Sequence, residues 1–181
     1  EVIKPTLKGM KDEGNYYTGF LYAGLMITAD GTPKVIEYNC RFGDPETQPV
    51  LLRLKSDLVS HCMAALNNSL NREKVEWETR KSLGVVMASG GYPGNYSNNH
   101  PILGLEDTSS EYGHKVFHGG TKFADNRLVT NGGRVLCVTA LGDSLEDAKT
   151  SAYELVSKIS WENVQYRTDI GWRAIEKNRK I

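Results

Sequence analysis

Residues 35–46 read VIEYNCRFGDPE, a short strand-like run followed by a sharp polar loop. Side chains alternate across a β-strand, so Glu37, Asn39 and Arg41 are expected to project from the same face. Carboxylate and amide oxygens suit Mg²⁺ or Mn²⁺, which proteins often share with nucleotide phosphates. The guanidinium adds a bidentate donor for a phosphate or a carboxylate. The spacing therefore indicates a metal and phosphate site, although the same alternation is typical of a solvated strand face.

The loop after this strand strengthens the interpretation as a functional site. Gly43 lets the backbone turn tightly, and Asp44 and Glu46 add two carboxylates beside Pro45. Irregular loops at strand ends often carry binding and catalytic residues. We therefore expect residues 43–46 to belong to the same site as the strand.

The sequence before this site predicts an antiparallel hairpin over residues 17–41. Residues 16–28 are apolar, aromatic and β-branched, which favours a mostly buried strand. Asp30 and Gly31 supply the chemistry of a tight turn. Residues 34–41 form the predicted second strand.

The sequence after the site predicts one long helix and then a surface crossover over residues 71–80. Thr47 is the expected cap of the helix, and Pro49 is tolerated in its first turn. Apolar residues recur at helical spacing along one face, at Leu51, Leu54, Leu58, Cys62 and Ala65.

The second half of the chain is predicted to be rich in strands and to contain one packed helix. The expected strands span residues 83–89, 115–123, 127–130 and 134–141. Asp143 and Glu146 have the spacing of a capping box at the start of the helix. The expected apolar face of this helix consists of Leu145, Ala148, Ala152, Leu155, Val156 and Ile159.

Composition excludes several classes of protein. The 22 basic and 22 acidic side chains of the 181 residues balance, which argues against nonspecific nucleic-acid binding. No apolar run approaches the roughly 20 residues of a membrane span. Cys40, Cys62 and Cys137 lack the spacing of a zinc site, so we expect reduced thiols in a cytoplasmic protein.

An ordered series of motifs resembles the phosphoribosylamine–glycine ligase family of the ATP-grasp superfamily. The series is GFLYAGLMIT, PKVIEYNCRFGDPETQPVLLRLKSDL, SLGVVMASGGYPG, KVFHGGTK, TNGGRVLCVTALG and YRTDIGWRAI, and it covers nearly the whole chain. The resemblance implies an ATP-dependent ligase of de novo purine biosynthesis. Such an enzyme joins glycine to phosphoribosylamine through glycyl phosphate and gives glycinamide ribonucleotide, ADP and phosphate.

The resemblance also implies roles for individual residues. Glu37 and Asn39 become the ligands of a Mg²⁺ or Mn²⁺ that bridges the ATP phosphates. Arg41 and Asp44 become catalytic, and the substrate-binding residues are Arg41, Gly43, Asp44, Pro45 and Glu46. Many ATP-grasp proteins place a further acidic metal ligand on the preceding strand, but residues 22–26 of this chain contain none.

The expected fold class is α+β, in two parts. Residues 1–80 would complete the C-terminal part of an ATP-grasp domain, and residues 81–181 would form a small β-barrel-like domain, a rudimentary hybrid motif. Because the chain begins without Met and resembles only part of the family, we expect a fragment that folds but is inactive without the N-terminal part of the same enzyme. The alternatives are another ATP-grasp carboxylate–amine ligase, a biotin-carboxylase-like enzyme, or a noncatalytic ATP-grasp-derived binding module.

Overall fold

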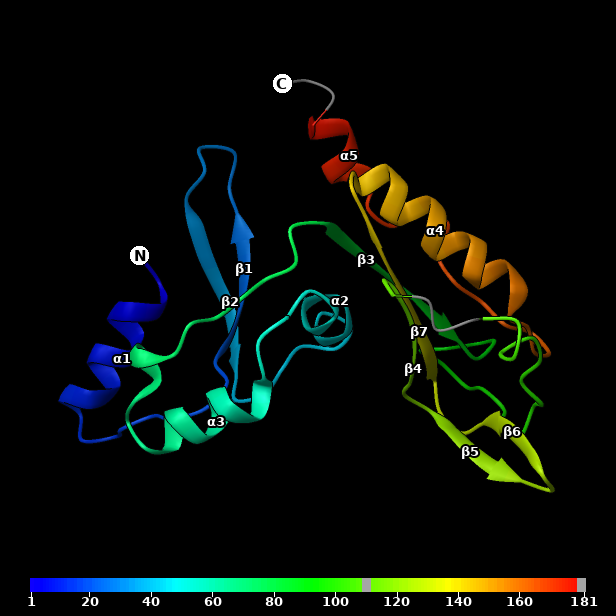
Figure 1. Cartoon of the computed structure of the whole chain (residues 1–181), viewed down its shortest axis with the longest axis horizontal. Helices are drawn as coiled ribbons and strands as arrows, with labels where there is room; N and C mark the ends of the chain where they lie inside the picture. Colours follow the sequence, from blue (N-terminus) through cyan, green and yellow to red (C-terminus); the bar gives the residue numbers. More distant parts are fainter. Residues whose placement is uncertain (109–111, 179–181) are drawn as a thin grey trace. The chain divides into compact units, whose positions relative to one another are not determined.

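A computed structural model describes residues 1–108 and 112–178 of the chain (Figure 1). Residues 109–111 and 179–181, which belong to the second predicted domain, lie outside the described residues. The chain divides into two compact units. The first unit consists of Glu1–Asp44 and Ser56–Glu76, and the second unit consists of Pro45–Lys55 and Trp77–Ile181. Both units combine helices with strands, so the predicted mixture of α and β structure is confirmed.

The first unit is organised around the predicted hairpin. Strands β1 and β2 pair antiparallel, with Tyr22 opposite Asn39 and Gly24 opposite Glu37, and the register shifts between Gly24 and Leu25. The turn between them contains Gly31 at a positive φ of 85°, a conformation that glycine adopts without strain. The elements of this unit are α1 (Ile3–Asp12), β1 (Tyr22–Ile27), β2 (Pro33–Asn39), α3 (Leu58–Leu66) and the 3₁₀ helix η1 (Leu70–Arg72).

The hairpin is less buried than its composition suggests. The prediction of a mostly buried strand over residues 16–28 is wrong, because β1 begins only at Tyr22 and none of its residues is fully buried. Met26 is 58% exposed and Ile36 is 65% exposed. A two-stranded hairpin cannot cover its own faces, so apolar residues stay accessible unless another layer packs on them. Helix α1 contacts this hairpin through the hydroxyls of Thr6 and Tyr38, whose oxygens are 2.6 Å apart.

The single helix predicted from Thr47 onward is wrong. The chain instead forms α2 (Thr47–Leu52) in the second unit and α3 in the first. Leu54 leaves the helical path and makes an isolated β-bridge with Trp77. The Asp57 carboxylate then accepts a hydrogen bond of 2.7 Å from the Ser60 N–H, which starts α3 with a regular cap. Thr47 is not a cap, because it is the first residue of α2.

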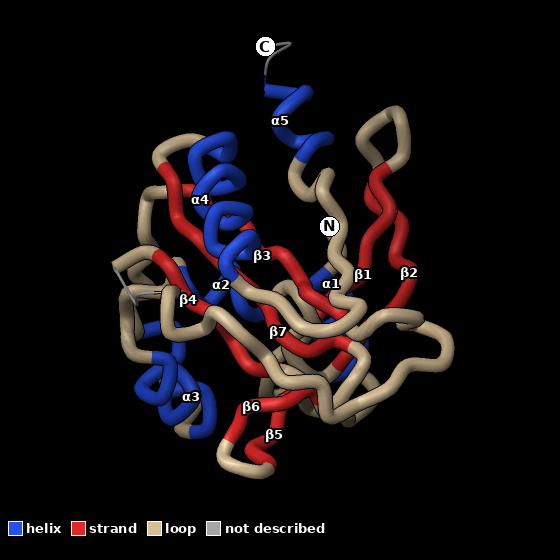
Figure 2. The backbone as a smooth tube through the Cα atoms, turned by 90° about the vertical axis from the view of Figure 1, so that its right-hand side faces the viewer, coloured by secondary structure: helices blue, strands red, loops and turns tan. Residues whose placement is uncertain are grey.

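The second unit contains an open antiparallel sheet in the order β3-β7-β4 and a separate hairpin of β5 and β6. Strand β7 is central and pairs with both neighbours (Figure 2). The predicted strand over residues 115–123 is wrong as one element, because Gly119 and Gly120 divide it. The elements are β3 (Lys81–Ala88), β4 (His114–His118), β5 (Thr121–Ala124), β6 (Arg127–Thr130), β7 (Arg134–Gly142), α4 (Leu145–Lys158) and α5 (Trp172–Asn178).

The core of the second unit lies between its sheet and α4. Helix α4 packs on β3 and β7 through Ala148, Ala152, Leu155 and Val156, which confirms the predicted apolar face at these positions. The capping box exists but is shifted by one residue from the prediction, since Ser144 and Asp147 form it. Among the described residues, no helix has both the length and the apolar character needed to cross a membrane.

Truncation of Met87 should destabilise the second unit. The side chain is fully buried in β3, so Met87→Ala leaves a cavity and lowers the free energy of unfolding by about 2–5 kcal/mol. Urea unfolding followed by circular dichroism measures this change. The matched control is Met26→Ala, whose side chain is 58% exposed, and it should cost less than about 0.5 kcal/mol. Equal losses for the two variants would contradict the placement of the core.

Candidate active site

Strand β2 places Glu37 and Asn39 on one face, as their spacing predicts. The Asn39 side-chain amide donates a hydrogen bond to Glu37 Oε1 over 3.0 Å. Gly24 lies directly opposite Glu37 on β1, and a Cβ atom at this position would lie only 3.1 Å from Glu37 Cγ. Because glycine carries no side chain, the Glu37 side chain can lie over the backbone of β1 at this position. Residues 22–27 of β1 contain no acidic side chain, so this strand adds no carboxylate to the pair.

This pair has a donor set that fits a hard divalent cation. The hydrogen bond occupies Glu37 Oε1 and Asn39 Nδ2, which leaves Glu37 Oε2 and Asn39 Oδ1 as oxygen donors. In the described part of the chain, no group of three or more His, Cys, Asp or Glu side chains is placed to hold a metal. A cation at the pair would therefore complete its shell with phosphate or water oxygens, as Mg²⁺ commonly does.

Arg41 lies in the loop rather than on the strand, because β2 ends at Asn39. Its Nη1 donates a hydrogen bond of 2.9 Å to the carbonyl oxygen of Phe42. Gly43 is buried and Asp44 is exposed. Thus the structure brings Glu37 and Asn39 into direct contact, and it places Arg41, Gly43 and Asp44 in the loop that follows.

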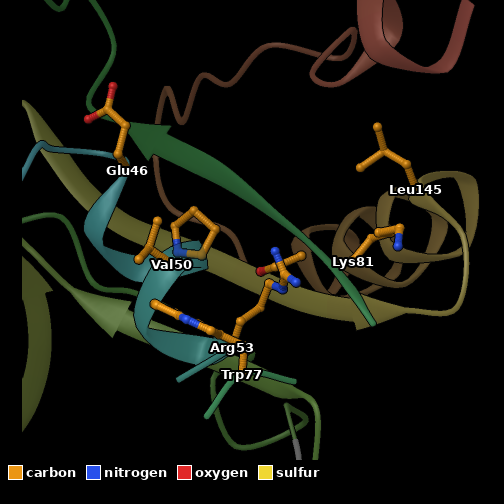
Figure 3. Close-up of a pocket in the computed structure, with 8 residues that line it drawn as sticks. Glu46, Val50, Arg53, Trp77, Lys81 and Leu145 are labelled. Atoms are coloured by element: carbon orange, nitrogen blue, oxygen red, sulfur yellow. The ribbon is translucent and has the colours of Figure 1, made fainter. Parts of the chain in front are cut away.

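Pro45 and Glu46 belong to the second unit, where Glu46 precedes α2. Glu46 is one of eight residues that line a cavity of about 700 Å³ (Figure 3). The cavity lies within the second unit and is bounded by α2, the start of β3 and the start of α4. Its lining consists of Glu46, Pro49, Val50, Arg53, Trp77, Lys81, Ser82 and Leu145.

This cavity has both polar and aromatic lining. The Arg53 guanidinium is held by two hydrogen bonds to the carbonyl oxygen of Glu78, from Nε over 3.3 Å and from Nη2 over 3.0 Å. Trp77 is 48% exposed, while Ser82 Oγ is buried and has no hydrogen-bond partner. Sequence reasoning missed these residues, because they come from separate segments and share no motif.

Glu78, next to this cavity, is the centre of a cluster of polar contacts. Arg80 Nη2 and the Tyr112 hydroxyl each donate to Glu78 Oε2 over 3.0 Å. The Arg80 guanidinium also lies over the Tyr112 ring, 5.0 Å from its centroid. The hydrogen bond from Arg80, and after it that from Tyr112, lowers the pKa of Glu78 to about 2. This cluster joins the crossover before β3 to the segment before β4.

A second polar cluster has the order of groups found in serine hydrolases. Ser97 Oγ lies 2.7 Å from His100 Nε2, and His100 Nδ1 lies 3.1 Å from Glu162 Oε2. A hydrolase also needs donors for an oxyanion and a cleft for its substrate. Ser97 and Glu162 are both exposed, and the backbone N–H of His100 donates a hydrogen bond to Thr130 Oγ1 over 3.2 Å. The cluster is best explained as a link between the loop at Ser97 and the segment at Glu162.

Comparisons with known families agree with the geometry. Residues 1–47 match the model of the phosphoribosylglycinamide synthetase ATP-grasp (A) domain. The hairpin with its carboxylate and amide is therefore part of an ATP-grasp domain. Residues 82–173 match the model of the phosphoribosylglycinamide synthetase C domain. The chain thus belongs to the phosphoribosylglycinamide synthetase family.

Individual relatives are similar over nearly the whole chain. The phosphoribosylamine–glycine ligase of Escherichia coli (strain K12) is 59% identical over 179 residues, which make up 98% of this chain and 42% of that relative. The ligase of Vibrio parahaemolyticus serotype O3:K6 is 57% identical over 180 residues, which make up 99% of this chain and 42% of that relative. A crystal structure of the ligase from Thermotoga maritima matches with a TM-score of 0.79 at 37% identity, over 91% of this chain and 40% of that one. The chain therefore spans about two fifths of the length of these relatives.

The Glu78 cluster predicts a pH dependence of stability. A carboxylate whose pKa falls on folding stabilises the folded state fully above its ordinary pKa of 4.5, and the contribution is lost as the pH falls toward about 2. Glu78→Gln should therefore lower the melting temperature near neutral pH. The difference in melting temperature between the variant and the wild type should become smaller below about pH 4.5.

Melting curves recorded across this pH range measure this difference. Glu106→Gln, at an exposed glutamate, removes the same charge without touching the cluster and serves as the control. If the difference in melting temperature between Glu78→Gln and the wild type were the same at about pH 7 and about pH 3, the ionised Glu78 carboxylate would not stabilise the fold as described.

Proposed function

We propose that this chain is the C-terminal part of a phosphoribosylamine–glycine ligase that uses ATP to join glycine to phosphoribosylamine. The observation that carries the proposal is the hydrogen-bonded pair of Glu37 and Asn39, followed directly by the loop RFGDPE at residues 41–46. Family membership and the ligase names of the relatives support the same reaction.

The proposed reaction has two steps, because the carboxylate of glycine is a poor electrophile. In the first step a carboxylate oxygen attacks the γ-phosphorus of ATP, and the bond from this phosphorus to the ADP oxygen breaks. In the second step the amine nitrogen of phosphoribosylamine attacks the carbonyl carbon of glycyl phosphate. The C–O bond to phosphate breaks, the amine loses a proton, and an amide forms. Catalysis of phosphoryl transfer consists mainly of positioning and charge neutralisation.

Residues of the first unit supply oxygen ligands for a metal ion and a positively charged guanidinium for this chemistry. Glu37 and Asn39 would hold Mg²⁺ or Mn²⁺, and the cation would neutralise charge on the ATP phosphates. The Arg41 guanidinium would exchange its bond to the Phe42 carbonyl for the oxygens of the acyl phosphate. Asp44 lies three residues further along the same loop, where its carboxylate would face the amine.

The remaining proposed substrate contacts come from the rest of the loop, at Gly43, Pro45 and Glu46. We assign residues 1–80 to the C-terminal part of the ATP-grasp domain and residues 81–181 to a β-barrel-like domain of the hybrid-motif type. The two compact units divide the chain differently, and the β3-β7-β4 sheet is open. The chain spans 42% of the length of its relatives, which supports a partner segment, the N-terminal part of the same enzyme. The chain alone is expected to form no product.

Removal of the Glu37 carboxylate should abolish the ligase reaction. In a full-length ligase that contains this chain, Glu37→Gln should lower ADP formation by about 100-fold or more, because one of the two oxygen ligands of the cation is weakened. The measurement is ADP release with ATP, Mg²⁺, glycine and freshly prepared phosphoribosylamine. Release should require both cosubstrates.

The matched control is Glu13→Gln, which removes an exposed carboxylate from the same unit. It should keep the wild-type rate. Wild-type release that needs no glycine, or no phosphoribosylamine, would contradict the proposed reaction. A Glu37→Gln enzyme with the wild-type rate would contradict the proposed metal site.

A further inference from the structure

Phe42, inside the RFGDPE loop, is held by an aromatic contact with a distant part of the chain. Its ring packs against the ring of Phe20, with centroids 4.0 Å apart and planes inclined by 33°. Both residues belong to the first unit. Phe20 precedes β1, and Phe42 follows β2. The contact therefore joins the entry of the hairpin to its exit.

The segment that carries Phe20 is itself fixed by Tyr17. The Tyr17 hydroxyl donates a hydrogen bond of 2.6 Å to the Phe20 carbonyl oxygen. Gly19 lies between them with a positive φ of 149°, and a Cβ atom there would lie 3.3 Å from the Tyr17 hydroxyl oxygen. Burial and, after it, a hydrogen bond with the Cys40 thiol raise the pKa of Tyr17. The hydrogen bond from the Tyr17 hydroxyl therefore holds the backbone at Phe20, immediately before β1.

Two groups of Phe42 are thus engaged at once. Its ring contacts Phe20, and its carbonyl oxygen accepts the hydrogen bond from Arg41 Nη1. The next residue, Gly43, is buried. The ring contact anchors the loop backbone at Phe42, and this anchor does not depend on the Arg41 hydrogen bond that the proposed reaction would exchange. The Asp44 side chain is exposed.

We propose that Phe42 and Phe20 are positioning residues for the ligase reaction. This inference rests on the proposed function. The contact of the two rings fixes the backbone of the loop, and the loop in turn aims the Arg41 guanidinium and the Asp44 carboxylate at the reacting groups. We assign neither ring a contact with the substrates. Since a displacement of about 1 Å at a reaction centre costs up to about 100-fold in rate, loss of the ring contact should be visible in the turnover number.

The test uses the full-length ligase and the same ADP assay. Phe42→Ala and Phe20→Ala should each lower kcat by about 10- to 100-fold. The Mg²⁺ concentration that gives half the maximal rate and the KM for ATP should change by less than about threefold, because the bonded pair of Glu37 and Asn39 precedes the loop. Phe42→Tyr keeps the ring and should restore most of the rate.

A double variant distinguishes one shared contact from two separate effects. Phe20→Ala combined with Phe42→Ala should lose no more rate than the slower single variant, because both substitutions remove the same contact. The control is Phe123→Ala on β5, whose ring is 74% exposed, and it should keep the wild-type rate.

Three results would overturn the inference. The first is a kcat equal to that of the wild type in both Phe42→Ala and Phe20→Ala, measured where the wild-type enzyme makes ADP with both cosubstrates. A parallel decline of kcat, ATP affinity, Mg²⁺ affinity and melting temperature would show a general structural role instead of positioning. An inactive wild-type enzyme would overturn the proposed function first, and the inference with it.

Discussion

The arrangement of the candidate site depends on the antiparallel register of β1 and β2. This register sets Gly24 opposite Glu37 and Tyr22 opposite Asn39. Glu37 is exposed, and the strand pleat brings the Asn39 amide within 3.0 Å of Glu37 Oε1. A slip of one residue would turn both side chains to the other face of the hairpin. The placement of the Glu37 and Asn39 oxygens on one face of β2 therefore follows from ordinary strand pairing, without a strained backbone.

The loop after β2 places Arg41 and Asp44 directly after the pair of Glu37 and Asn39. The strand ends at Asn39, so the direction of the Arg41 side chain is not set by strand alternation. A hydrogen bond to the Phe42 carbonyl oxygen orients the Arg41 guanidinium instead. The ring of Phe42 ties this loop to the segment before β1. The second unit has a separate core, built around β7 and α4, which supports α2 and the cavity that Glu46 lines.

Sequence periodicity predicted the elements whose signal is local. The turn at Asp30 and Gly31, strand β6 and the buried face of α4 all follow from residues within a few positions of one another. The shared face of Glu37 and Asn39 also follows from alternation alone. The break between α2 and α3 was not predicted, because Leu54 keeps helical spacing although it bridges to Trp77 in the structure.

Other features depend on contacts between distant residues, so no local pattern reports them. The apolar run at residues 16–28 suggested burial, but burial depends on a covering layer that composition cannot reveal. The contact between Phe20 and Phe42 is invisible to periodicity because the whole hairpin separates the two rings. The lining of the cavity beside α2 likewise comes from segments that meet only after folding.

The most direct test of the proposed metal site is a crystal structure of a full-length protein that contains this chain, with Mg²⁺, glycine and a nonhydrolysable ATP analogue. One carboxylate oxygen of Glu37 and the amide oxygen of Asn39 should both lie about 2.1 Å from a Mg²⁺ that also contacts the phosphates. A cation held entirely by other residues, with Glu37 and Asn39 still paired only to each other, would contradict the proposed metal site.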